Sequence, residues 1–192
     1  NQELRPSSRE LTLQSPPERL AFASGLQRIK PHDRLEWAMR LLAAVGPQDA
    51  SDHNLPLMTW YAIEPIVGLD RNGTQRLLTA AQIPLVREFI ARKAIGTDSA
   101  YISMFLDHAA AAKEPSVARE MLQGVIDGLG GVRRAPMPAE WTTAGPKLLG
   151  HADAVVRERA MALAVTFEDE TAIEAMKATL TASSAAAPAR TA

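Results

Sequence analysis

The sequence contains no cysteine, and this absence removes several kinds of chemistry at once. Disulfides, thiolate nucleophiles, cysteine-ligated zinc, iron–sulfur clusters and covalently attached haem all require cysteine. Aromatic residues are scarce, at 5%, and uninterrupted apolar runs are short. A membrane-spanning helix needs about 20 apolar residues. We therefore expect no direct insertion of this chain into a membrane.

Charge of one sign is also not in excess. The 21 basic and 22 acidic side chains give a formal net charge of -1. Affinity for nucleic acid depends on a surplus of Lys and Arg that contacts phosphates, so we expect no nucleic-acid partner. Hydrophobic residues make up 46% of the chain and are mainly Ala and Leu, which favour helices. Composition therefore predicts an all-α protein.

An internal repeat indicates how the expected helices are arranged. Residues 54–68 align without gaps with residues 82–96, and Pro56 falls on Pro84. Because proline is tolerated in the first turn of a helix and glycine favours its end, each segment predicts one helix. Comparable segments recur at irregular steps of about 30–40 residues, which is typical of helix-pair solenoids. We expect a right-handed α-solenoid of HEAT-like pairs with about ten helices.

This architecture implies a division of the chain into three parts. Residues 1–14 are expected to be a leader or the end of a preceding repeat, and residues 15–182 the repeat domain. Residues 183–192, rich in Ala and Ser, are expected to be a frayed tail or the start of a truncated repeat. Neither end has obvious polar caps, so we expect apolar array ends, as in a chain cut from something longer.

The most suggestive polar cluster lies between two expected helices. We consider it, with two later residues, the best candidate for an interaction surface. Its members are Asp49, Asp52, His53, Asn54, Trp60 and Glu64. Asp52 or Asn54 is expected to cap the next helix. Trp60 aligns with the charged Glu88 and is expected to be exposed. Tyr61 aligns with Phe89 and is expected to be in the core.

An alternative function for this region is a metal- or ligand-binding site that completes the active site of a missing domain. Asp52, His53 and Glu64 would carry it. Their side chains offer oxygen and imidazole ligands, but convergence on one point is required. Nothing else in the sequence matches a metal or nucleotide motif, so no catalytic, cofactor-binding or metal-ligating residue is assigned.

Arginine recurs near the start of the expected helices. The positions are Arg19, Arg87, Arg119 and Arg157. One hypothesis is a basic ladder for an acidic partner. The other, which near-zero net charge favours, is that each arginine pairs with a carboxylate of the neighbouring repeat and joins the stack.

The segments 52–65 and 83–92 resemble the helical-repeat region of large bacterial membrane-bound dehydrogenases of the planctomycete type. Members of that family carry a β-propeller, HEAT-like repeats and a cytochrome c domain with a C-x-x-C-H haem site. The resemblance covers roughly residues 16–180. Because this chain has no cysteine, the haem c of such a parent has no counterpart here, and no cofactor is expected. The resemblance implies a spacer in an exported, periplasmic protein.

The functional expectation is a scaffold without catalytic activity of its own. Its partners would be other domains of a parent chain or another protein. A free-standing HEAT adaptor in the cytoplasm is a further alternative. A reading frame that encodes helical repeats alone would favour that alternative.

Overall fold

The computed structural model describes residues 13–185, which form ten α-helices and two short 3-10 helices, with no strand among these residues. The predicted all-α class is confirmed. In chain order the elements are α1 (Pro16–Leu26), α2 (Pro31–Ala44), η1 (Pro47–Ser51), α3 (Leu55–Ile63), η2 (Glu64–Ile66), α4 (Arg71–Ala80), α5 (Pro84–Thr97), α6 (Tyr101–Ala111), α7 (Pro115–Gly128), α8 (Trp141–Leu149), α9 (Ala154–Thr166) and α10 (Glu170–Ala185).

Two kinds of residue fix where the helices begin. Proline occupies the first turn of α1, α2, α3, α5 and α7, where its missing N–H has no helical partner to lose. Aspartate precedes two other helices. The carboxylate of Asp70 accepts from the Gly73 N–H at 2.7 Å, and that of Asp153 accepts from the Val155 and Val156 N–H groups at 3.0 Å. The helix starts are therefore set by local sequence.

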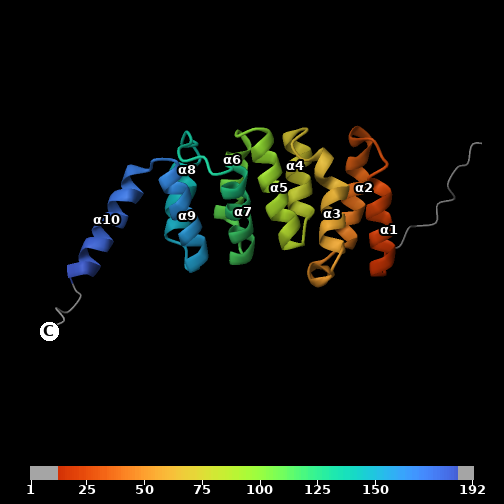
Figure 1. Cartoon of the computed structure of the whole chain (residues 1–192), viewed down its shortest axis with the longest axis horizontal. Coiled ribbons are helices and arrows are strands. Elements are labelled where there is room, and N and C mark those ends of the chain that lie inside the picture. Colours follow the sequence, from red (N-terminus) through yellow and green to blue (C-terminus); the bar gives the residue numbers. More distant parts are fainter. Residues whose placement is uncertain (1–12, 186–192) are drawn as a thin grey trace, which may run out of the picture.

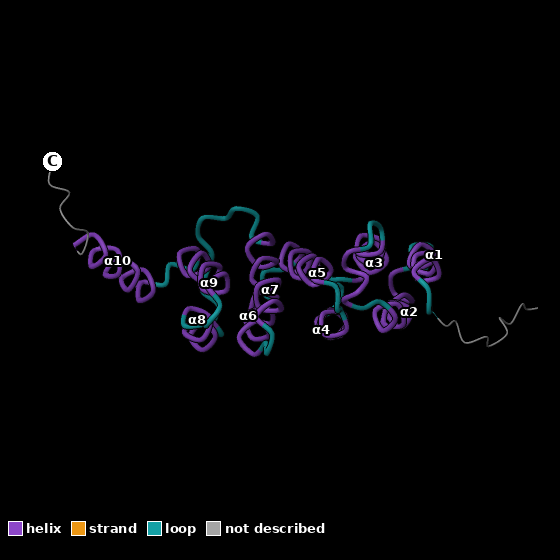
Figure 2. The backbone as a smooth tube through the Cα atoms, turned by 90° about the horizontal axis from the view of Figure 1, so that it is seen from below, coloured by secondary structure: helices purple, strands orange, loops and turns teal. Residues whose placement is uncertain are grey.

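The helices stand side by side in a row, which Figure 1 shows along its length. The odd-numbered helices α1, α3, α5, α7 and α9 pack in succession, each on the next. The helices α2, α4, α6 and α8 form a second layer, in which α2 packs on α4 and α6 packs on α8 (Figure 2). This arrangement of stacked pairs fits the predicted α-solenoid. The last helix, α10, packs on α9 and leads away from the row.

One apolar core runs through the row from α1 to α10. Its largest fully buried side chains are Trp141, Phe105, Leu26, Leu41, Leu42, Leu55, Ile63, Leu77, Leu78, Ile83, Ile90 and Leu106. Each such side chain contributes about 1.5–3 kcal/mol when it leaves water. Because the core lies between neighbouring helices, each pair is stabilised mainly by the pairs beside it.

The closest helix contact in the row is between α5 and α7, and glycine permits it. A Cβ atom at Gly124 would lie 2.5 Å from the Ala91 Cβ and 2.5 Å from the Glu88 carbonyl oxygen. One turn later, a Cβ atom at Gly128 would lie 2.8 Å from the Ile95 Cβ. At these two positions the backbones of α5 and α7 therefore approach closely, with no side chain of α7 between them.

Three expected boundaries differ from the structure. The helix predicted across residues 54–68 ends at Ile63 and continues as the 3-10 turn η2, because Pro65 has no N–H to extend it. Gly68 does adopt a left-handed conformation, with φ of 85°. Gly96, expected to end the second repeat helix, instead lies inside α5. The predicted tail begins too early, because α10 extends to Ala185.

Candidate functional site

The candidate site is a hollow of about 420 Å³ between α3 and α5. Its lining residues are Trp60, Tyr61, Glu64, Arg92, Lys93, Gly96 and Thr97. Two of the residues singled out from the sequence, Trp60 and Glu64, are therefore brought together here. The α5 residues of the lining were not predicted.

The orientations expected for the two aromatic residues of α3 are wrong. Trp60 is 5% exposed, and its ring packs edge-on against Phe89 with the ring centroids 5.4 Å apart. Tyr61 is instead 48% exposed. The prediction assumed that Glu88, which aligns with Trp60, faces water. Glu88 is itself half-buried, and burial is the main cause that raises the pKa of its carboxyl group.

Exposed apolar side chains on α3 stand beside the hollow. Leu57 and Tyr61 are separated by one helical turn, and they are 40% and 48% exposed. Residues 55–63 contain no charged side chain, so α3 is apolar on its exposed side as well as its buried side. A helix that is apolar all round is ordinarily buried. The uncharged composition of this segment is the sequence signal that could have identified the surface.

Charged groups of α5 form the opposite wall. The Lys93 ammonium group lies 3.2 Å from a carboxylate oxygen of Glu64, and both side chains are about 40% exposed. The Arg92 guanidinium lies over the Phe89 ring, with its Cζ atom 4.3 Å from the ring centroid. Arg92 forms no ion pair with any residue in the described part of the chain. Its N–H donors remain available.

Asp49 does not belong to an interaction surface, which corrects the prediction. It is 3% exposed, and its Oδ1 atom lies 2.7 Å from Nη2 of Arg19. Its Oδ2 atom accepts from the Gly46 N–H at 3.0 Å and closes the turn η1. The carboxylate is therefore fully engaged inside the protein.

The loop residues Asp52, His53 and Asn54 are exposed but do not assemble a site with Glu64. Asp52 accepts hydrogen bonds from the Leu55 and Asn54 N–H groups at 2.9 and 2.8 Å. These bonds, with that to Leu55 the larger cause, lower the pKa of the Asp52 carboxyl group. Within residues 13–185 no three His, Asp or Glu side chains are placed to hold a metal ion. Asp52 therefore accepts from the first N–H group of α3, as the capping hypothesis predicted, whereas the side chain of Asn54, at the N-cap position, makes no capping bond.

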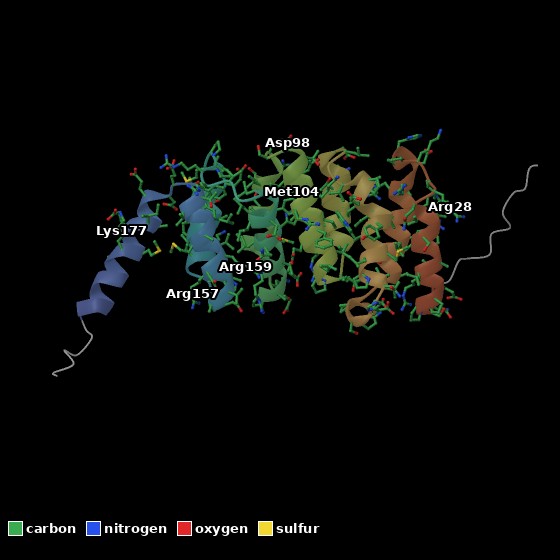
Figure 3. All side chains as sticks on the ribbon, viewed as in Figure 1. Arg28, Asp98, Met104, Arg157, Arg159 and Lys177 are labelled. Carbon is green, nitrogen blue, oxygen red and sulfur yellow. The ribbon has the colours of Figure 1, made fainter. Side chains whose placement is uncertain are left out.

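Three of the four recurring arginines form the expected ion pairs with the next helix pair. The pairs are Arg19–Asp49 at 2.7 Å, Arg87–Glu120 at 2.5 Å and Arg119–Asp153 at 3.7 Å. Arg157, labelled on α9 in Figure 3, instead donates to the carbonyl oxygens of His151 and Ala152 in its own loop. Arg19 and Arg87 also donate to carbonyl oxygens just before their own helices.

Arg34 also connects neighbouring helix pairs, and the sequence did not predict this role. It is 4% exposed and donates to the carbonyl oxygens of Gln27, Ile29 and Ala62. It thereby connects the turn before α2 to the end of α3. Burial lowers the pKa of its guanidinium group. Arg34 does not share the position of the recurring arginines near the start of repeat helices, so the repeat pattern does not identify it.

The sequence predicts apolar surface at the ends of the row, and the first helix pair exposes aromatic side chains. Trp37 on α2 is 39% exposed and lies near Phe22 of α1, with ring centroids 6.4 Å apart. A second hollow of about 270 Å³ is lined there by residues of α1, α2 and Leu13. This pair therefore presents aromatic surface at the start of the row.

Comparison with known protein families, curated proteins and solved structures finds no match to this chain. No helix within the described residues is both long enough and apolar enough to span a membrane.

Proposed function

We propose that this chain is a non-catalytic helical-repeat scaffold that docks a protein segment against α3 and the hollow between α3 and α5. The observation that carries the proposal is the exposed pair Leu57 and Tyr61 on a helix without any charged residue. Clustered exposed apolar side chains beside a hollow are typical of protein interaction sites. The buried and partly buried ion pairs between helix pairs fit the same role, because they connect the helices that carry the surface.

The family resemblance extends this proposal to the identity of the partner. In that setting the docked segment belongs to another domain of a longer exported dehydrogenase, and the chain is the spacer between a propeller and a cytochrome c domain. The flanking reading frame tests the extension. An upstream propeller and a downstream C-x-x-C-H sequence would support it. A frame encoding helical repeats alone would favour a free-standing adaptor with a separate protein partner.

A direct test of docking is to select binders from a displayed library of random peptides, with the whole chain as bait. We expect selected peptides, made synthetically, to bind the wild-type chain and to lose most of their affinity for Tyr61→Ala. The matched control is Met137→Ala, since Met137 is also 48% exposed but lies in the loop before α8. Binding should survive that change.

Thermal unfolding of both variants checks that each remains folded. Exposed side chains rarely change stability by more than about 0.5 kcal/mol. If no peptide is selected, or if all selected peptides bind Tyr61→Ala as well as wild type, docking at this surface is wrong.

A further inference from the structure

We infer that the segment docked at this surface carries a carboxylate next to an apolar side chain, with Arg92 as the residue that binds the carboxylate. The inference rests on the proposed docking function and adds the chemical class of the partner. It is argued from the charges that line the hollow and from the position of the Arg92 side chain.

The lining of the hollow has more positive than negative charge. Arg92 and Lys93 are its two cations, and Glu64 is its one carboxylate. Glu64 is already paired with Lys93 at 3.2 Å. Arg92 is thus the cation left without a partner in the lining. A negatively charged group on a docked segment complements this charge.

Arg92 is held in a position suited to this role. Its guanidinium lies over Phe89, and Phe89 in turn meets the buried ring of Trp60. Stacking on an aromatic ring limits the rotamers of arginine, so less entropy is lost when its planar group binds a carboxylate. Glu88 lies one turn before Arg92 on α5 and interacts with it electrostatically. Among the ion pairs of the described residues there is none between Glu88 and Arg92.

Apolar contacts complete the recognition. Tyr61 lines the hollow with Arg92, and Leu57 extends the same exposed side of α3. A docked segment can place an aliphatic or aromatic side chain on Leu57 and Tyr61 while an adjacent Asp or Glu reaches Arg92. A basic segment would meet Arg92 and Lys93 with like charge. The surface therefore favours acidic over basic segments.

The test uses peptides selected on the whole chain that require Tyr61. Each acidic residue of one such peptide is replaced in turn by its amide, Asp by Asn or Glu by Gln. Dissociation constants are measured by calorimetry against wild type, Arg92→Gln and Arg28→Gln. Arg28 is a matched exposed arginine at the α1 end of the row, labelled in Figure 3.

We expect one amide replacement to weaken binding to wild type about two- to fivefold, as loss of the charge from an exposed ion pair would. The same replacement should have little effect with Arg92→Gln, and its full effect with Arg28→Gln. If the peptides require Tyr61 but contain no acidic residue, or if the loss persists in Arg92→Gln, the inference is wrong while docking stands. If no peptide requires Tyr61, docking itself fails and the inference fails with it.

Discussion

Buried polar side chains join neighbouring helix pairs in two different ways. Arg19 and Asp49 form an ion pair in which both side chains are almost fully buried. Arg34 is equally buried but is surrounded by carbonyl oxygens. An unpaired buried charge would be very unfavourable, so each arginine depends on a particular backbone or carboxylate position. Removal of either partner would leave a buried group uncompensated, so these contacts tie neighbouring helix pairs together.

Thr59 is a fully buried residue of α3 whose side-chain hydroxyl is left unpaired among the described residues. It occupies the position on α3 that corresponds to the recurring arginines, is 0% exposed, and its hydroxyl has no hydrogen-bond partner. Burial of an unpaired hydroxyl costs about 1–3 kcal/mol. We predict that Thr59→Val, which keeps the branched shape, raises the free energy of unfolding by about 1 kcal/mol. Denaturant unfolding followed by circular dichroism measures this change.

Thr74 provides the matched control for that substitution. It is also 0% exposed, but its hydroxyl accepts from the Gly68 N–H and donates to the Asp70 carbonyl, both at 2.9 Å. Thr74→Val should therefore lower stability by about 1–3 kcal/mol, because the Gly68 N–H loses its acceptor. Equal effects of the two substitutions would show that the Thr59 hydroxyl is not unpaired in solution.

At the scale of single helices, the contact between α5 and α7 depends on the absence of a side chain at Gly124. A methyl group there would meet the Ala91 Cβ and the Glu88 carbonyl oxygen, each at 2.5 Å. Because the backbone cannot yield cheaply, the two helices must move apart. We predict that Gly124→Ala destabilises the protein by about 1–3 kcal/mol, the usual cost of overpacking. Thermal unfolding of the purified variant measures the loss.

Gly25→Ala is the control for this prediction. Gly25 lies within α1, and a Cβ atom there would have no neighbour within 4 Å. Since alanine is a better helix former than glycine by about 0.5–1 kcal/mol, this change should be neutral or stabilising. Destabilisation by Gly25→Ala, or tolerance of Gly124→Ala, would contradict the close-contact interpretation.

The helices themselves could be predicted from sequence because their signals are local. Proline in the first turn and a repeating apolar pattern located α5 to within a residue at its start. The faces of α3 could not be predicted in the same way. Trp60 and Tyr61 are both aromatic, and which one is buried depends on where Phe89 of α5 lies. Local sequence carries no information about the position of Phe89 relative to α3.

The candidate site was predicted only in part for a similar reason. Glu64 was identified, but its partner Lys93 lies on a different helix pair. No motif marks Arg92, whose role depends on its stacking on Phe89 and its place in the hollow. Asp49 was predicted to be exposed because it lies in a loop with other polar residues. Its carboxylate is instead buried in an ion pair with Arg19. Long-range ion pairs of this kind have no spacing rule.

At the scale of the whole molecule, two carboxylates at helix starts contribute to the response to acid. Hydrogen bonds from backbone N–H groups lower the pKa of Asp52 and of Asp153, chiefly those of Leu55 and Val156. A group whose pKa is lowered by folding adds stability above its unfolded pKa of about 3.9. That stability is lost as the pH falls through the lower folded pKa.

We predict that Asp153→Asn, which keeps a capping acceptor but cannot ionise, makes the melting temperature less dependent on pH in this acidic range. The melting temperature of wild type and variant is measured at successive pH values. Their difference should shrink as the pH falls below about 4. A difference that does not change with pH would contradict a contribution from ionisation of Asp153.

Glu88 should have the opposite effect on how stability depends on pH. Burial, together with Asp127 and Glu120, raises the pKa of its carboxyl group, while Arg159 and Arg92 oppose the rise. When folding raises the pKa of an acid, the folded state binds the proton more tightly, so stability decreases as the pH rises from about 4.3 through the folded pKa. The Glu88 carboxyl group therefore contributes less to the stability of the junction of α5 and α7 at neutral pH than in acid.

We predict that Glu88→Gln raises the melting temperature at neutral pH and that this gain disappears as the pH falls through the raised pKa of Glu88. The matched variant Glu120→Gln removes a carboxylate one helix away that is paired with Arg87, and it should lower stability at neutral pH. A gain from Glu88→Gln that persists in acid would assign its effect to packing. A gain in melting temperature that disappears when Glu88 is protonated would show that the charge of its carboxylate destabilises the folded protein.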